Sequence, residues 1–176
     1  MSTVREQVRE SVSANPGIHF NELTRRLDIA TGQAQYHLRK LVRAGDIDAE
    51  EVRGRTHYFD REYDPWERRA IALVRRETTR SIVGHLLEDG PLASVELVDR
   101  LDVARSTVSW HVESLIEAGV AEKSYGQRGQ AVVALTRPAE TRRLLRTVEP
   151  SLADRLVDRF SRLVDDSLGR NGHSNN

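Results

Sequence analysis

The apolar residues at the start of the chain recur with a helical period. Val4, Val8 and Val12 lie four residues apart, which predicts a helix over residues 4–13. Asn15-Pro16-Gly17 then breaks that helix. Alternating residues over 18–20 predict a short strand, and a second helix is expected to begin near Asn21.

The next stretch predicts two amphipathic helices joined by a tight turn. Leu23 and Leu27 lie one helical turn apart, and the spacing of three and four continues after the turn, at Ala34, Leu38, Leu41 and Val42. Thr31 is expected to cap the later helix through its hydroxyl, as Ser106 or Arg105 would further along the chain. Gly45 is expected to end it in a left-handed conformation.

A two-stranded hairpin is predicted after Gly45. A charged strand begins at Ile47, a turn covers Glu50 to Gly54, and residues 56–59 return as a strand rich in aromatic residues. Arg53 and Arg55 flank the glycine at the tip.

The whole pattern then repeats. RRLDIATGQAQYHLRKLVRAG, residues 25–45, recurs as DRLDVARSTVSWHVESLIEAG, residues 99–119, at a constant offset of 74 residues that also aligns Glu22 with Glu96. The identical pairs are Leu23/Leu97, Arg26/Arg100, Leu27/Leu101, Asp28/Asp102, Ala30/Ala104, His37/His111, Leu41/Leu115, Ala44/Ala118 and Gly45/Gly119. Such spacing indicates two copies of one module.

The order helix, turn, helix, hairpin in both copies resembles winged helix-turn-helix DNA-binding modules. The chain is similar to archaeal transcriptional regulators that carry two such modules in tandem, over about residues 4–136. The family's usual recognition-helix sequence is matched closely in copy two, by RSTVSWHVESLIEAGVAEKS, and more loosely in copy one, by TGQAQYHLRKLVRAGDI. The fold class implied is mainly α with small β-wings, followed by a carboxy-terminal helical segment.

We expect five segments along the chain. Residues 1–60 and 78–136 are the two modules, and residues 61–77 form a linker helix capped by Asp64 with Glu67 in a capping box. Residues 137–170 form carboxy-terminal helices, the first opened by Pro138, and residues 171–176 a disordered tail. The apolar stripe of the last helix predicts either docking on its own module or a homodimer contact, through Leu152, Leu156, Phe160, Leu163, Val164 and Leu168.

The resemblance places the second helix of each copy in the major groove of double-stranded DNA. Side chains that point away from the core stripe, together with the wing tips, are then the candidate contacts, because Gln can bond adenine and Arg guanine or phosphate. These residues are Gly32, Gln33, Gln35, Tyr36, Arg39, Lys40, Arg53, Arg55, Arg105, Ser106, Thr107, Ser109, Trp110 and Arg128.

The two copies differ in charge. Residues 31–45 contain three cations and no acid, whereas residues 105–119 contain one Arg and two Glu. We therefore expect copy one to be the main DNA reader.

Composition narrows the function. The net charge is zero, so the chain as a whole lacks the excess of positive charge that is typical of nucleic-acid-binding proteins. The alternative is therefore a protein-interaction module in a transcription or chromosome-maintenance complex. The chain has no Cys and no catalytic motif, so no enzyme, cofactor or metal site is predicted. His37 and His111 are expected to bridge their helices to neighbouring backbone or to phosphate. A cytoplasmic, nucleoid-associated protein is expected, and a small-molecule effector cannot be specified from the residues.

Overall fold

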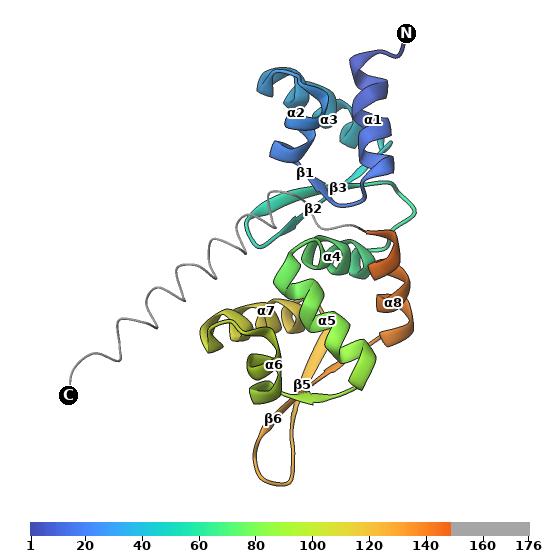
Figure 1. Cartoon of the computed structure of the whole chain (residues 1–176). Coiled ribbons are helices and arrows are strands. Elements are labelled where there is room, and N and C mark those ends of the chain that lie inside the picture. Colours follow the sequence, from blue (N-terminus) through green and yellow to red (C-terminus); the bar gives the residue numbers. More distant parts are fainter. Residues whose placement is uncertain (149–176) are drawn as a thin grey trace, which may run out of the picture. The chain divides into compact units, whose positions relative to one another are not determined.

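The computed structural model describes residues 1–148, and the chain divides into two compact units, Met1–Leu73 and the residues from Val74 onward. Each unit has the same succession of elements (Figure 1). The predicted dimerisation stripe, Leu152 to Leu168, and the tail lie outside the described residues.

In the first unit three helices precede a small sheet. The elements are α1 (Val4–Ala14), β1 (Ile18–His19), α2 (Phe20–Leu27), α3 (Thr31–Ala44), β2 (Asp48–Val52), β3 (Arg55–Phe59) and α4 (Pro65–Val74). The sheet is antiparallel with strand order β1-β3-β2. The short strand before α2 therefore completes the sheet of the hairpin, a pairing that the sequence pattern does not predict.

The second unit repeats this arrangement. Its elements are α5 (Glu77–Asp89), β4 (Leu92–Ala93), α6 (Ser94–Leu101), α7 (Arg105–Glu117), β5 (Ala121–Tyr125), β6 (Ala131–Leu135) and α8 (Pro138–Thr147). The strand order is β4-β6-β5. Helix α8 begins at Pro138, as predicted, and Arg80 of α5 donates to the carbonyl oxygens of Leu145, at 2.6 Å, and of Val148.

The cores explain the repeat. Buried residues of the first unit form one cluster, namely Val8, Val12, Ile18, Leu23, Ala34, Leu38, Leu41 and Ile47. Their counterparts 74 residues later are Ile82, Leu86, Leu92, Leu97, Val108, Val112, Leu115 and Ala121, and these are also buried. Apolar burial at matching positions is what holds the two sequences in register.

The sequence predicts how the two recognition helices begin and end, and the structure confirms the ends but not the beginnings. Gly45 has φ 72° and Gly119 φ 73°, so both positions are left-handed as predicted. The predicted caps at the start of the recognition helices are wrong. Ala30 and Ala104 are the capping residues and neither α3 nor α7 has a side-chain cap, because Thr31 and Arg105 are already the first helical residues. These helix ends are exposed, so water can satisfy their free amides.

The first hairpin is tighter than predicted. Strand β2 continues to Val52, which pairs with Arg55, so the turn contains only Arg53 and Gly54 rather than residues 50–54. Arg53 has φ 51° and Gly54 φ 75°, as in a type I′ turn, whose twist matches that of the strands it joins. Val52 is buried, which favours the longer strand.

Helix α4 begins with the capping box expected from the sequence. The Glu67 amide donates to Asp64 Oδ1 at 2.8 Å, and the Asp64 amide donates to Glu67 Oε2 at 2.9 Å. Arg68, on the same helix, binds Asp48 at 3.0 Å and Glu50 at 3.3 Å on strand β2. The start of α4 is therefore attached to the first hairpin by ion pairs.

Candidate nucleic-acid interface

Helix α3 separates its residues into a buried and an exposed face. Ala34, Leu38 and Leu41 are buried on one side. The six residues predicted from this helix as DNA contacts are all exposed, namely Gly32, Gln33, Gln35, Tyr36, Arg39 and Lys40. One helix thus carries two glutamines, an aromatic ring and cations on a single solvent-facing surface.

This surface is positive. Arg39, Lys40 and Arg43 are exposed, and within residues 1–148 none of the three forms an ion pair with a carboxylate. The Lys40 ammonium lies 5.5 Å from the centroid of the Tyr36 ring, which is 57% exposed. That contact holds the cation near an aromatic face that could stack on a base.

Two acids of the first hairpin are engaged by ion pairs with α4. Asp48 and Glu50 on β2 bind Arg68, and Glu50 also lies 3.7 Å from Arg69. Arg53 and Arg55, at the tip of the hairpin, are half-buried and already make contacts within the unit. Their guanidinium groups therefore come from a tight turn of defined conformation.

Helix α7 also exposes its predicted contacts, with two exceptions. Arg105, Ser106 and Ser109 are exposed, whereas Thr107 is partly buried. Trp110 is 40% exposed, but the Arg76 guanidinium carbon lies 4.9 Å from its ring centroid. One face of the indole is thus covered by an arginine of its own unit.

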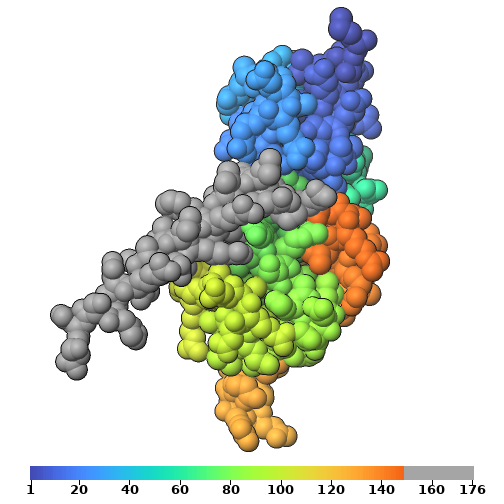
Figure 2. Space-filling model, viewed as in Figure 1, coloured from blue at the N-terminus to red at the C-terminus, as the bar shows by residue number. Residues whose placement is uncertain are grey.

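The second hairpin is built differently from the first. Five residues, Gly126 to Gln130, form its loop, closed by a hydrogen bond from the Gly126 amide to the Gln130 carbonyl at 2.9 Å. Arg128 is exposed at this tip. The end of the hairpin β5–β6 projects beyond the helices of its unit (Figure 2). One cation therefore stands where the first unit has two.

The equivalent histidines have different environments. His111 is 4% exposed, and its Nδ1 lies 2.7 Å from Thr79 Oγ1 of α5. Its Nδ1 is thus bound by a side-chain hydroxyl of α5, a partner that the sequence does not predict. His37 is less buried, and its Nδ1 has no hydrogen-bond partner within the described residues. Arg5 stands where the second unit has Thr79.

The first unit also contains a cluster of buried polar residues. His19 and His57 are almost fully buried with their ring planes at 89°, and His57 Nδ1 lies 2.7 Å from the Gly17 carbonyl oxygen. His19 caps α2 by accepting the Glu22 amide at 3.4 Å, and Glu22 in turn binds Arg26 at 3.1 Å. The sequence offered no signal for this cluster beyond the histidines themselves.

Two further features concern ionisable groups. Burial raises the pKa of Tyr58, which lies beside the interface on β3, so its hydroxyl stays protonated at neutral pH.

Three residues of the second unit bring one potential metal-ligand atom each within 4.8 Å of one another, namely His85, Glu88 and Asp89. The sequence pattern does not predict this group. Asp89 is ion-paired with Arg100, so it is already engaged by a cation.

Comparison with known proteins assigns both units to the same type of domain. Residues 2–71 match a family described as an N-terminal HTH domain, and residues 76–123 match one described as a helix-turn-helix domain. The chain thus carries two helix-turn-helix domains in tandem.

Among the proteins similar to this chain is an uncharacterized HTH-type transcriptional regulator of Methanocaldococcus jannaschii. It is 26% identical over 129 residues, which are 73% of this chain and 32% of the relative. The chain thus spans about a third of the length of that relative.

Two solved structures resemble the chain with low TM-scores. The DIP2311 protein of Corynebacterium diphtheriae is 20% identical with a TM-score of 0.32, covering 75% of this chain and 26% of that one. The mRNA-binding domain of elongation factor SelB from E. coli is 16% identical with a TM-score of 0.32, covering 76% and 99%. Similarity at this level carries no argument about function. Within the described residues, no helix is both long enough and apolar enough to cross a bilayer.

Proposed function

We propose that the chain is a sequence-selective DNA-binding transcription regulator that inserts its recognition helices into the major groove. The observation that carries this proposal is the outward face of α3, which presents Gln33, Gln35 and Arg39 without an acidic neighbour on the helix. Glutamine can bond the edge of adenine through two hydrogen bonds, and arginine that of guanine. A face of this kind offers both attraction to phosphate and base discrimination.

The wings are proposed to bind the phosphate backbone. Arg53 lies in the two-residue turn of the first hairpin and Arg55 directly after it, and Arg128 lies in the loop of the second hairpin. These side chains are held at the end of a hairpin rather than along a helix in the groove. Contacts from such tips fix the position of a protein on the duplex and carry no base information directly. Sequence preference is then left to the helices.

The first unit is proposed to be the main DNA reader. Its recognition helix is cationic, whereas α7 carries Glu113 and Glu117, which phosphate repels. The Arg76 contact also restricts Trp110. Arg105, Ser106 and Ser109 remain exposed at the start of α7, so the second unit adds a weaker contact.

A salt titration tests the proposal. Binding of the full chain to a random-sequence duplex is measured by fluorescence anisotropy between 50 and 200 mM salt, the range over which a protein making several phosphate contacts loses affinity steeply. Arg39→Ala with Lys40→Ala should weaken binding and flatten the slope. Arg9→Ala with Arg146→Ala removes two exposed cations outside the proposed interface and should change little.

The same titration separates the alternative. A chain that shows no salt-dependent binding to any duplex would favour a winged-helix protein-interaction module, to which the zero net charge is suited. Sequence selectivity requires a second step, in which the bound duplexes are selected from a random pool and sequenced. Equal recovery of all sequences would reduce the proposal to non-selective DNA binding.

We also propose that the regulator is a homodimer joined through residues 151–168, a segment outside the described residues. The support is its sequence stripe, which runs from Leu152 to Leu168 at helical spacing. A dimer would bind pseudo-palindromic sites. A chain cut after Glu149 should lose half its mass in solution, and a truncated protein that stays dimeric would place the interface elsewhere.

A further inference from the structure

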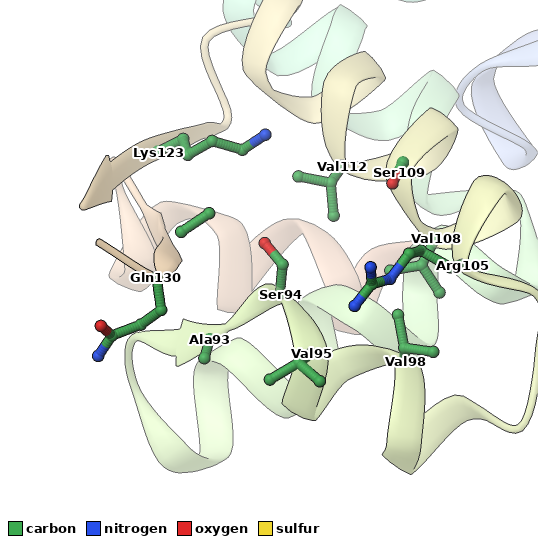
Figure 3. A pocket seen from close by; sticks show the side chains of 11 residues that line it. Ala93, Ser94, Val95, Val98, Arg105, Val108, Ser109, Val112, Lys123 and Gln130 are labelled. Atoms are coloured by element: carbon green, nitrogen blue, oxygen red, sulfur yellow. The ribbon is translucent and has the colours of Figure 1, made fainter. Parts of the chain in front are cut away.

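A groove of about 380 Å³ opens in the second unit between the start of α6, the first turns of α7 and the hairpin β5–β6 (Figure 3). Its volume lies within the range of small-molecule sites in proteins. Three elements distant in sequence converge on it, so the groove exists only in the folded unit.

The floor of this groove is apolar. Val95 and Val98 come from α6, Val108 and Val112 from α7, and Ala131 from β6. Val95 is 49% exposed although it is a β-branched aliphatic residue on a surface helix. Figure 3 shows Val95, Val98 and Val108 along one side of the groove. Val95 and the partly buried Val98 thus extend the buried core residues Val108 and Val112 to the surface, and an apolar patch in a concave surface indicates a binding site more often than apolar residues scattered singly.

The first unit shows that the fold does not require valines at positions 95 and 98. A cavity of about 320 Å³ lies at the corresponding place, and its lining is more polar, with Asn21, Gln35, Arg55 and Thr56 beside Phe20 and Tyr58. At the offset of 74 residues, Val95 replaces Asn21 and Val98 replaces Thr24. Because the first unit folds with polar side chains at these two positions, Val95 and Val98 serve something besides folding, whereas Val108 and Val112 belong to the core like their counterparts Ala34 and Leu38.

Two cations border the apolar floor. Arg105 reaches the groove from the first residue of α7 and Lys123 from β5, and no acidic side chain lines it. Figure 3 shows both side chains extending into the space between helix and hairpin. The first unit has Thr31 and Ala49 at these two positions, and the arginine that lines its own cavity is Arg55, from the hairpin.

We infer that this groove binds a small amphipathic carboxylate, whose hydrocarbon part lies on the valines and whose charge is met by Arg105 and Lys123. The binding itself does not depend on the proposed function. Its consequence does, because Arg105 and Ser109 also belong to the proposed DNA contacts of α7. A bound carboxylate would therefore compete with DNA for the second recognition helix and leave the first unaffected.

Octanoate is the probe, titrated into the full chain without DNA and followed by two-dimensional amide NMR. Shifts should be confined to α6, α7 and β5–β6. Because each buried methylene contributes to affinity, the dissociation constant should fall about fourfold for each carbon added from hexanoate to octanoate. Absence of any shift at solubility-limited octanoate, or shifts spread over both units without chain-length dependence, would overturn the inference.

Substitutions test the two halves of the groove separately. Val95→Asn with Val98→Thr gives the second unit the residues of the first and should weaken octanoate binding about tenfold or more. Asn21→Val with Thr24→Val is the matched control in the first unit and should leave that binding unchanged. An unaltered octanoate affinity of the Val95→Asn, Val98→Thr variant would contradict the proposed contact between the hydrocarbon chain and these valines.

The charge is tested with a neutral analogue. Arg105→Ala should weaken octanoate about tenfold but leave octanol binding unchanged, because only the carboxylate uses the guanidinium. Equal losses for both molecules would mean that Arg105 acts through packing alone and would contradict the carboxylate assignment. A final arm adds octanoate to the DNA complex. If octanoate binds but the affinity for DNA is unchanged, the result supports carboxylate binding in the groove and contradicts the proposed role of α7 in DNA binding.

Discussion

The two units of this chain have nearly the same interior and different exteriors. Eight buried positions of the first unit have buried counterparts in the second, whereas α3 and α7 carry opposite net charge on their exposed faces. Burial restricts a position to apolar residues of suitable size, while an exposed position is free to change with function. The repeat is therefore visible in the core, and the division of roles is visible on the surface.

The exposed differences are coordinated. The first unit combines a cationic recognition helix, a two-arginine turn and a polar groove, whereas the second combines acids on α7, a longer loop with one arginine and an apolar groove. These elements contribute to different surfaces of the module, yet within each unit they change in the same direction. This is the pattern expected when one copy reads DNA and the other has acquired a second ligand.

The largest effect is expected from the matched cores. Leu41→Ala and Leu115→Ala each remove a fully buried side chain at equivalent positions and should lower the free energy of unfolding of their own unit by about 2–5 kcal/mol. Hydrogen exchange resolved by peptide should show faster exchange in the substituted unit only. Equal acceleration in both would show that the units unfold together.

The recognition helices provide the next comparison. Arg39→Ala should weaken binding to a selected duplex by about 1–3 kcal/mol and relax the preference at one base pair, while Arg105→Ala should cost less. Anisotropy titrations with the same duplex and buffer measure both. If Arg105→Ala abolishes binding and Arg39→Ala is silent, the second unit is the main reader.

The equivalent histidines His37 and His111 have different hydrogen-bond environments inside the two units. Thr79→Val leaves the buried Nδ1 of His111 without its hydroxyl partner and should destabilise the second unit by about 1–3 kcal/mol. The counterpart residue Arg5 makes only a surface ion pair with Asp46, at 3.2 Å, so Arg5→Ala should change stability by less than about 1 kcal/mol. Urea unfolding of both variants measures the difference, and the reverse ranking would refute it.

The wings are expected to give the smallest effect. Arg53→Ala with Arg55→Ala should lower the magnitude of the log-log salt slope by about 0.9 for each phosphate contact removed, and Arg128→Ala by no more than one such step. Affinity should fall alike for all sequences. An unchanged slope accompanied by altered base preference would mean that the first wing reads bases.

Most of the architecture followed from local patterns. The helical spacing of Leu23, Leu38 and Leu41, the left-handed glycines at 45 and 119 and the repeat itself are properties of neighbouring residues, so the sequence contains them directly. The exposed face of α3 followed in the same way, because a helix with a known buried stripe leaves only one surface for its polar residues. The interface candidates on that helix were therefore accessible without coordinates.

Contacts between distant residues required the tertiary structure. The pairing of β1 with β3, the Thr79–His111 hydrogen bond and the Arg76–Trp110 contact join residues from separate elements, and no local period records which of them meet. The apolar groove is the clearest case. Val95, Val112 and Lys123 are unremarkable along the chain, and only the folding of α6, α7 and β5 around one space brings hydrocarbon and positive charge together.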